Sequence, residues 1–357
     1  MNNDLTTDLQ QQVTQAASAS TRLTIQAGGS KSFLGTLNDA TQLNLSSHSG
    51  IISYEPTELV ITARSGTTLE ALNTTLAESG QSLAFEPPAF GASATIGGTI
   101  ACAMAGPAKP YLGGTRDYIL GCHILNGRGE LLKFGGEVMK NVAGYDVSRL
   151  MTGAMGTLGV LMDVSIKVLP TPEQSITLAY PTDAASAIEE MQTLAGLGLP
   201  VTASAYIGDT LYTRVSGTEA SITASAKKIK GELSDQPDLW RELREQTLPF
   251  FDLTENQTLW RISTPALTPP LNLNGEWLYD WAGMQRWLIT EDSASSVRSI
   301  AQSAGGHATI FRGTDALKRA EGTFHPLPGP LLALHKRLKQ EFDPNGVFNH
   351  QRLFQEF

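Results

Sequence analysis

The chain of 357 residues contains only two cysteines, Cys102 and Cys122, and they do not form a CxxC pair. This excludes a disulfide framework, an iron–sulfur cluster and a structural zinc site built from cysteines. Basic residues are in the minority, 26 against 35 acidic ones, and a net charge of −9 argues against a general nucleic-acid binder. The polar N-terminus and the lack of an apolar run of about 18–20 residues predict a cytoplasmic chain with no signal peptide and no transmembrane segment.

Acidic residues are absent from one long stretch, residues 87–115, which holds six Gly, seven Ala and a single Lys. Side chains this small let a backbone approach a ligand closely, and unmasked N–H groups suit a bound anion. The stretch closes on the opposite charges of Arg116 and Asp117. It predicts a large phosphate-bearing cofactor along residues 87–121. A glycine-rich surface turn followed by a small-residue helix is the alternative.

A second glycine-rich turn, Ala27-Gly-Gly-Ser-Lys-Ser-Phe-Leu-Gly35, follows a strand predicted at 23–26. Its N–H groups are suited to a pyrophosphate, with Lys31 or Ser32 nearby. The dinucleotide fingerprint G-x-G-x-x-G is absent, and a P-loop is excluded because Ser30 precedes Lys31 and Ile25 stands where the first Gly belongs. A Gly-Gly hairpin turn is the alternative interpretation.

The remaining elements up to residue 172 alternate between strands and helices. Pro170-Thr-Pro172 then predicts a boundary. The predicted elements are a helix at 4–18, strands at 51–54 and 59–63, a helix from the capping box Thr67-Thr-Leu-Glu70 to Gly80, a hairpin of 118–125 and 130–134, a short helix at 147–151 and a strand at 160–169.

All five tryptophans lie between residues 173 and 325, where glycine is less frequent. Helices at 184–197 and 221–233 and strands at 204–215 and 277–288 predict a separate α+β domain. Trp277, Tyr279 and Trp281 alternate, which predicts an aromatic strand face in the core or, alternatively, at a ligand or partner surface. A last helix is predicted with one apolar stripe and with cations in its final turns; these residues are Leu331, Leu334, Leu338 and Phe342, and Lys336, Arg337 and Lys339.

Four motifs in this order resemble the flavoprotein family with a vanillyl-alcohol-oxidase-type (PCMH-type) FAD-binding domain. Further motifs resemble, within that family, the FAD-binding subunits of bacterial glycolate oxidase, and the resemblance covers essentially the whole chain. The first four are Ala27–Ser32, Ala94-Thr-Ile-Gly-Gly98, Gly113-Gly-Thr-Arg-Asp117 and Gly156-Thr-Leu-Gly-Val160; the further ones are Pro87-Pro88, Lys140-Asn-Val-Ala-Gly-Tyr-Asp146 and Phe342-Asp-Pro-Asn-Gly-Val-Phe-Asn349.

The resemblance implies an α+β fold. It consists of a PCMH-type FAD-binding domain over residues 1–172, made of two α/β subdomains at about 1–85 and 86–172. A smaller α+β cap domain, an antiparallel sheet with helices, spans 173–325. The C-terminal segment 326–357 is expected to return to the FAD-binding domain.

The resemblance also assigns the FAD-binding residues to four segments. The first binds the pyrophosphate, the second lies close to the pyrophosphate and ribityl chain, the third flanks the flavin, and the fourth meets the adenine end. Because covalent members carry a histidine where this chain has Ser30, FAD is expected to be held non-covalently. In that order the residues are Ala27, Gly28, Gly29, Ser30 and Lys31; Pro88, Ala94, Thr95, Gly97 and Gly98; Gly113, Thr115, Arg116 and Asp117; and Gly159 and Val160.

The sequence departs from the family in two places. The larger catalytic relatives carry an H-x-G-D-G-N-x-H stretch in the second domain, whereas here His307 and His325 are isolated and are interpreted as structural or surface residues. No catalytic residue is therefore assigned, and no metal is expected. The frequent ending Asn-Pro-Gly-Lys is replaced by Asn349-His-Gln-Arg352, and the resemblance places Asn349 and Arg352 near the flavin.

The function implied is that of an FAD-binding subunit of a glycolate oxidase (glycolate dehydrogenase) complex. Glycolate or a D-lactate-like 2-hydroxy acid gives a 2-oxo acid, and electrons pass to an iron–sulfur subunit. The expected partners are that subunit and a second, catalytic FAD-containing subunit, with no nucleic acid, and the complex is cytoplasmic or peripheral at the inner membrane. The alternatives are a non-catalytic structural flavoprotein subunit that docks these partners, and a self-contained oxidase.

Overall fold

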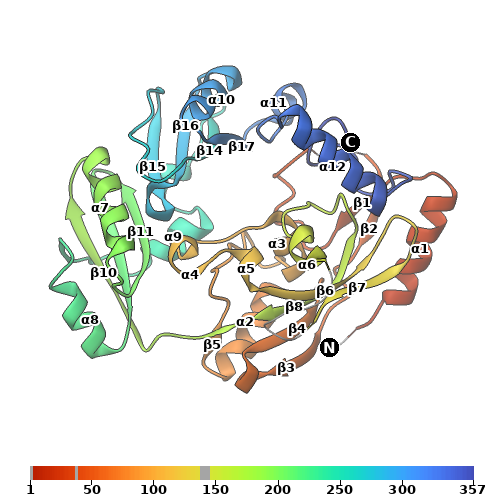
Figure 1. The fold of residues 1–357 in the computed structure, drawn as a ribbon, viewed down its shortest axis with the longest axis horizontal. Helices are drawn as coiled ribbons and strands as arrows, with labels where there is room; N and C mark the ends of the chain where they lie inside the picture. Colours follow the sequence, from red (N-terminus) through yellow and green to blue (C-terminus); the bar gives the residue numbers. More distant parts are fainter. Residues whose placement is uncertain (1–2, 37–38, 137–144) are drawn as a thin grey trace. The chain divides into compact units, whose positions relative to one another are not determined.

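The computed structural model describes residues 3–36, 39–136 and 145–357, which form two compact units of α+β structure (Figure 1). The first unit contains Met1–Met104, Gly114–Pro170 and Pro326–Phe357, and the second contains Ala105–Gly113 and Thr171–His325. The segment Ala105–Gly113, which the sequence prediction assigns to the FAD-binding domain, thus lies in the second unit. Most of the Lys140–Asp146 motif lies outside the described residues.

The centre of the first unit is a five-stranded antiparallel sheet with β3 at one edge and β7 at the other (Figure 1). Ile61, Ile124 and Val164 are fully buried on it, and helices α2, α3 and α6 belong to the same unit. In sheet order the strands are β3 (Ile51–Glu55), β4 (Val60–Arg64), β8 (Val160–Lys167), β6 (Ile119–Leu125) and β7 (Leu131–Gly135); the helices are α2 (Leu69–Glu78), α3 (Ile96–Cys102), α5 (Thr115–Tyr118) and α6 (Val147–Met151).

A smaller parallel pair of strands, β1 (Leu23–Gln26) and β2 (Thr41–Asn44), packs with the N-terminal helix α1 (Thr6–Ser18). Leu9 and Val13 of α1 are buried, as the i, i+4 spacing predicts. The C-terminal segment joins this cluster, because Phe348 forms a parallel bridge with Leu23 and is fully buried. Strands β5 (Gln81–Ser82) and β9 (Leu169–Pro170) form a separate pair.

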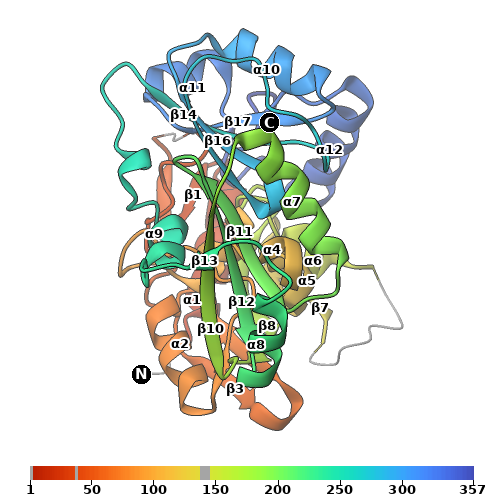
Figure 2. The same ribbon diagram turned by 90° about the vertical axis from the view of Figure 1, so that its left-hand side faces the viewer.

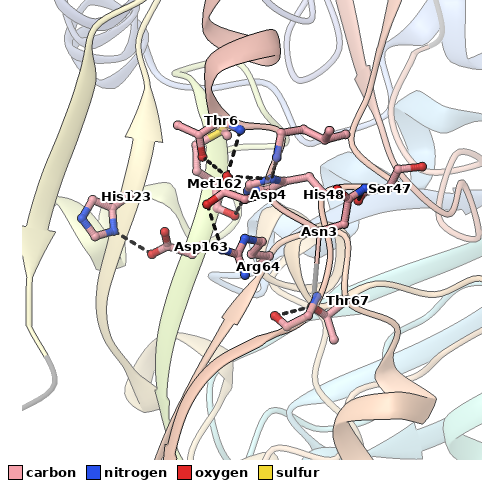
Figure 3. A network of polar contacts seen from close by, with 12 residues as sticks. Asn3, Asp4, Thr6, Ser47, His48, Arg64, Thr67, His123, Met162 and Asp163 are labelled. Carbon is pink, nitrogen blue, oxygen red and sulfur yellow. Dashed lines mark hydrogen bonds and ion pairs between the residues drawn. The ribbon is translucent and has the colours of Figure 1, made fainter. Parts of the chain in front are cut away.

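A polar network fixes the start of α1 to the central sheet (Figure 3). Arg64 donates to Asp4 at 2.8 Å, and the hydrogen bond from the Thr6 hydroxyl, followed by that from Arg64, holds the pKa of Asp4 well below its usual range. His48 is 1% exposed; its Nδ1 accepts from the Leu5 N–H at 3.0 Å, so Nε2 carries the proton and donates to the Met162 carbonyl at 3.1 Å. Burial lowers the pKa of His48. This histidine is a neutral structural residue.

The second unit is built on an eight-stranded antiparallel sheet with α7 and α8 over one face of β10, β11 and β12 (Figure 2). Helix α10 (Ala294–Ser303) packs on Trp260, Leu288 and Ile310. In sheet order the strands are β13 (Glu232–Leu233), β10 (Gln174–Pro181), β12 (Thr210–Gly217), β11 (Val201–Ile207), β15 (Glu276–Asp280), β16 (Gln285–Thr290), β14 (Thr258–Ser263) and β17 (His307–Arg312); the other helices are α4 (Lys109–Leu112), α7 (Ala184–Gly196), α8 (Glu219–Ala226), α9 (Leu239–Glu245) and α11 (Asp315–Glu321).

Three elements predicted in the second unit are wrong. The single strand at 204–215 is the hairpin of β11 and β12, because Gly208 and Asp209 both have positive φ and reverse the chain. The strand at 277–288 is likewise the hairpin of β15 and β16, so Trp281 (φ +51°) lies in the turn rather than on a strand face. The helix at 221–233 ends at Ala226, and residues 232–233 form β13 instead.

Two details of the first unit also differ from the prediction. The N-cap of α2 is Thr68 rather than Thr67; the Thr68 hydroxyl accepts from Ala71 N–H, while the Thr67 hydroxyl bonds to Gly50. The stripe predicted on α12 (Gly329–Phe342) is wrong, since Leu331 and Leu334 are exposed and Lys339 is the buried residue of the helix. The strands at 51–54 and 59–63, the helix at 147–151 and the 118–134 hairpin are confirmed.

Candidate cofactor-binding site

A cavity of about 130 Å³ opens in the first unit between the two strands β1 and β8 and helix α3. It brings together four segments that are far apart in the sequence: the turn after β1, the start of α3, the glycine turn before β8, and the C-terminal segment. The residues that line it are Thr24–Ser32, Leu45, Ser65, Thr95, Gly97, Gly98, Ala101, Cys102, Met151, Met155, Gly156, Gly159, Leu161, Asn349 and Arg352.

The turn after β1 offers open hydrogen-bond donors. Gly29 has φ +70°, a conformation that glycine adopts at little cost. The N–H groups of Gly28, Gly29 and Ser30 donate to no atom within residues 3–36, 39–136 and 145–357. Successive unmasked N–H groups in such a turn form a concavity suited to an anion. The predicted residues Ala27, Gly28, Gly29, Ser30 and Lys31 all line the cavity here.

The charges on the cavity wall have one sign. Lys31 and Arg352 are its cations, and the lining residues include no carboxylate. Lys31 is 6% exposed and donates to the Ala89 carbonyl at 3.3 Å. Burial lowers the pKa of Arg352, but a guanidinium starts so high that it stays protonated at neutral pH. A chain of net charge −9 therefore keeps an acid-free, positively charged pocket.

The second predicted segment reaches the cavity through Thr95, Gly97 and Gly98. Three of its N–H groups are already used: Ile96 and Gly97 donate to the carbonyls of Thr67 and Ser65 at 2.9 Å, and Gly98 donates to the Thr95 hydroxyl at 3.3 Å. The sequence predicts that both glycine stretches are rich in open N–H groups, whereas in the structure both glycines of the second stretch that line the cavity, Gly97 and Gly98, have N–H groups that already donate within the protein.

Glycine is required where the first two segments meet. A Cβ on Gly28 would lie 1.5 Å from the Ser93 carbonyl oxygen, and the Ser93 hydroxyl donates to the Gly28 carbonyl at 2.6 Å. A Cβ on Gly97 would lie 2.5 Å from the Ser65 Cβ. These two glycines let the backbones approach closely and so bring the segments to one cavity.

Several predicted residues do not line the cavity. Gly113 lies in the second unit. The Thr115 hydroxyl donates to Met104 O at 2.6 Å, Asp117 accepts from the Gly114 N–H at 2.8 Å, and Arg116 donates to the Arg149 carbonyl at 3.1 Å. Pro88, Ala94 and Val160 are buried beside the lining residues, and of the fourth segment only Gly159 lines the cavity. Their cofactor roles stay predictions.

Sequence reasoning missed Ser65, Cys102, Met155 and Gly156 on the cavity wall. Ser65 is 2% exposed, and within the described parts of the chain its hydroxyl is one of the buried groups with no hydrogen-bond partner. The Cys102 thiol is half-buried, whereas Cys122 is buried and its thiol pKa is raised to about 12 by burial. For Ser65, the sequence shows only that Ser65-Gly66 forms a turn at the end of β4, and such a turn does not indicate a binding site.

The residues present fit FAD. Its diphosphate carries negative charge, and the cavity offers N–H donors, two cations, an unpartnered serine hydroxyl and glycines that leave the backbone uncovered. Elsewhere, no helix of residues 3–36, 39–136 and 145–357 is long and apolar enough to cross a membrane. Those same residues contain no cluster of three or more His, Cys, Asp or Glu placed to hold a metal ion.

Comparisons with known proteins agree with this chemistry. The family model described as an FAD binding domain matches residues 5–135. The chain is 45% identical to the glycolate oxidase subunit GlcE of Escherichia coli (strain K12) over 353 residues, which cover 99% of this chain and 98% of GlcE. It is 31% identical to a D-lactate dehydrogenase of Anaerostipes hadrus over 146 residues, which cover 41% of this chain and 30% of that protein.

Among solved structures, one of alkyldihydroxyacetonephosphate synthase matches with a TM-score of 0.66 and 12% identity, covering 97% of this chain and 74% of that one. At this identity the match shows a shared fold alone. The solved structure thus supports the fold, and the sequence relatives support the family.

Proposed function

This chain belongs to the family of FAD-binding flavoproteins that includes the glycolate oxidase subunit GlcE, and from that premise we propose that it is the FAD-binding subunit of a glycolate-oxidising complex. Its cofactor is FAD. The substrate proposed is glycolate or a D-lactate-like 2-hydroxy acid, which becomes a 2-oxo acid as two electrons leave it. When bound, FAD supplies the redox chemistry that accepts them.

The observation that carries the proposal is the acid-free cavity with open N–H groups at Gly28, Gly29 and Ser30. These groups and the Lys31 and Arg352 cations would hold the diphosphate. Because residue 30 is a serine rather than a histidine, we propose that no covalent bond to FAD forms there. The protein's contribution is to bind the cofactor, to fix its orientation and to exclude acidic groups from its phosphates.

We also propose that the chain works with partners. GlcE is named as a subunit, and this chain has only the two cysteines Cys102 and Cys122, one lining the cavity and one buried. Since a [4Fe–4S] or [2Fe–2S] cluster needs about four cysteine ligands, a cluster that accepts the electrons would belong to another polypeptide. The partners proposed are an iron–sulfur subunit and a second, catalytic flavoprotein subunit.

Reconstitution tests the proposal. The purified chain is expected to take up about one FAD per chain, and precipitation with acid should release that FAD from the protein. A colourless protein that takes up no FAD would refute the proposal, and FAD that stays with the precipitate would refute the non-covalent part. Co-purification from the native source, with flavin and iron counted, tests the partners.

Cys102 gives a test that locates the FAD on this chain. In the FAD-free protein a thiol reagent should modify Cys102, because this thiol lines the cavity, and bound FAD should slow that reaction at least about tenfold. Cys122 is the internal control, because its buried thiol should stay unmodified in both forms. Equal labelling of Cys102 with and without FAD would place the cofactor elsewhere.

A second candidate function is a structural flavoprotein subunit that docks its partners without oxidising substrate. The observation that favours it is the histidine pattern of the second unit, where His307 and His325 lie on or after β17 without the H-x-G-D-G-N-x-H stretch. Anaerobic mixing of the FAD-loaded chain with glycolate or D-lactate separates the two functions. Bleaching of the flavin absorbance would refute the structural one.

A further inference from the structure

We infer that the C-terminal segment Val347–Arg352 holds the two opposite walls of the cofactor cavity in place, with Asn349 as the positioning residue that joins them. The inference rests on the proposed FAD site. It assigns to Asn349 a role in cofactor affinity that requires no contact with the cofactor.

Asn349 connects the walls directly through its side-chain amide. The Oδ1 atom accepts from the Ile25 N–H at 2.8 Å, and Nδ2 donates to the Met155 carbonyl at 2.6 Å. Ile25 lies two residues before the turn that carries the open N–H groups, and Met155 begins the glycine turn before β8. The side chain is 6% exposed, and each end of its amide has a partner in one wall. One lone pair of Oδ1 and one hydrogen of Nδ2 are therefore used to join the two walls.

The C-terminal segment forms hydrogen bonds with residues before and after the turn that follows β1. The Leu23 N–H donates to Val347 O at 2.7 Å, and the Asn349 N–H donates to Leu23 O at 3.0 Å. These two bonds form a parallel bridge between Phe348 and Leu23 of β1. On the other side of the turn, Arg352 donates to the Ser32 carbonyl at 3.1 Å, and Thr36 N–H donates back to Arg352 O at 3.3 Å. The turn is thus held before and after its open N–H groups.

A buried ion pair fixes the segment to the rest of the unit. Lys339 Nζ lies 2.6 Å from Asp343 Oδ2 and also donates to the carbonyls of Thr157 and Phe348, each at 2.8 Å. Asp343 accepts from the N–H groups of Val347 and Phe348 at 2.9 and 2.8 Å. Thr157 belongs to the same glycine turn as Met155, so the pair anchors both the C-terminal segment and the second wall.

Each wall is a glycine-rich turn. The second is also held to the end of α3, because the N–H groups of Gly153 and Met155 donate to the carbonyls of Ile100 and Ala101 at 3.0 and 2.9 Å, so Asn349 joins the first wall to an anchored one. A site built on turns binds tightly only when the turns are held in the binding geometry before the ligand arrives. Loss of the Asn349 amide should leave every proposed FAD contact in place and yet weaken FAD binding, since the distance between the walls is no longer fixed.

The test uses Asn349→Leu in the full-length chain, because leucine has a similar shape and removes both hydrogen bonds. The dissociation constant for FAD, from quenching of flavin fluorescence, is expected to rise about 10- to 100-fold. In the FAD-free protein, hydrogen exchange of peptides covering residues 23–32 and 153–160 should accelerate, while peptides of the second unit stay unchanged. The matched control is Asn345→Leu, since Asn345 is exposed in the turn after α12 and should change neither readout.

A milder variant keeps the inference testable if Asn349→Leu fails to fold. Arg352→Lys keeps the positive charge and loses the fork that reaches Ser32 and Thr36. Because Arg352 is also a proposed diphosphate contact, the decisive readout is the FAD-free protein, in which hydrogen exchange of peptides covering residues 23–32 should accelerate. FAD affinity and exchange rates equal to those of the unaltered protein in both variants would overturn the inference. If the unaltered protein itself binds no FAD, the proposed function fails, while the exchange rates of the FAD-free variants still decide the positioning role.

Discussion

The first and second units are stabilised in different ways. In the first, glycines such as Gly28 and Gly97 allow backbone segments to touch, and the cavity wall between them is made of turns. In the second, the sheet carries packed rings, with Trp287 and Phe311 at 4.8 Å and Trp277 stacked on Tyr279 at 5.9 Å. The first unit should therefore resist a larger side chain at Gly28 and Gly97, and the second should resist the loss of a large ring such as Trp287 from its sheet.

One buried cation from each unit shows two ways of satisfying a buried charge. Lys339 of the first unit is 9% exposed and is paired with the fully buried carboxylate of Asp343. Arg286 of the second unit is fully buried and donates instead to the carbonyls of Gly283, Pro269 and Thr268. All five tryptophans belong to the second unit, so tryptophan fluorescence reports on its unfolding, whereas FAD binding and far-UV circular dichroism include the first.

The largest effect is expected from Gly28→Val. The added side chain would overlap the Ser93 carbonyl, since even a Cβ would lie 1.5 Å from that oxygen. FAD binding should weaken at least about 100-fold in a fluorescence titration, while the tryptophan emission of the second unit stays unchanged. Gly329→Ala is the control, because a Cβ there meets nothing within 4 Å. An FAD affinity within threefold of normal for Gly28→Val would contradict the close approach.

Lys339→Met should destabilise the first unit by about 3–5 kcal/mol, because it leaves the Asp343 carboxylate buried without its cation. Chemical denaturation followed by circular dichroism should show an earlier transition for the first unit, with the tryptophan-detected transition unmoved. The exposed Lys336→Met on the same helix is the matched control and should change stability by less than about 0.5 kcal/mol. Similar midpoints for both variants would exclude a structural role for the ion pair.

Arg286→Met should destabilise the second unit and leave the first unit unchanged. Three carbonyl groups of the second unit would lose their donor, at a cost of about 2–3 kcal/mol. The tryptophan-detected midpoint should fall, and the FAD dissociation constant should stay within twofold. Arg241→Met, at an exposed arginine of α9, is the control. A weakened FAD site in Arg286→Met would show that the two units do not respond independently.

The smallest effect concerns pH. The pKa of His48 lies below its ordinary value of 6.5, because burial outweighs the attraction of Asp4 and Asp163, and Arg64 adds to the lowering. Between the two values only the unfolded chain binds the proton, so the free energy of unfolding should fall as pH decreases below about 6.5. Protonation of Nδ1 would also remove the bond from Leu5 N–H. Between pH 7.5 and 5.5 in urea denaturation, the loss of stability should be smaller in His48→Gln than in the unaltered chain, by at most about 1.4 kcal/mol, the linkage limit for one pH unit below the ordinary pKa.

Local patterns predicted much of the fold. The strand pair at β3 and β4, the hairpin of β6 and β7 and the end of α2 at Gly80 depend on neighbouring residues, and all are confirmed. The prediction failed where long alternating runs, such as 204–215, hide a two-residue turn at Gly208 and Asp209. It failed again on α12, because nothing in the helix itself shows that Lys339 has a buried partner and that Leu331 has none.

For the candidate site, too, the sequence predicted one part and the tertiary structure decided the rest. The glycine turn Ala27–Lys31 and the acid-free stretch follow from the sequence, because small residues and missing carboxylates are visible in it, and the choice of FAD follows from the family resemblance of its motifs. Which turns face the cavity, and which N–H groups are still open there, was decided by the tertiary structure. Asn349 is 324 residues from Ile25, and Arg352 is 320 from Ser32. The family resemblance placed Asn349 and Arg352 near the flavin. Their hydrogen bonds to Ile25 and Ser32 join segments at opposite ends of the chain, so no local pattern could show these partners.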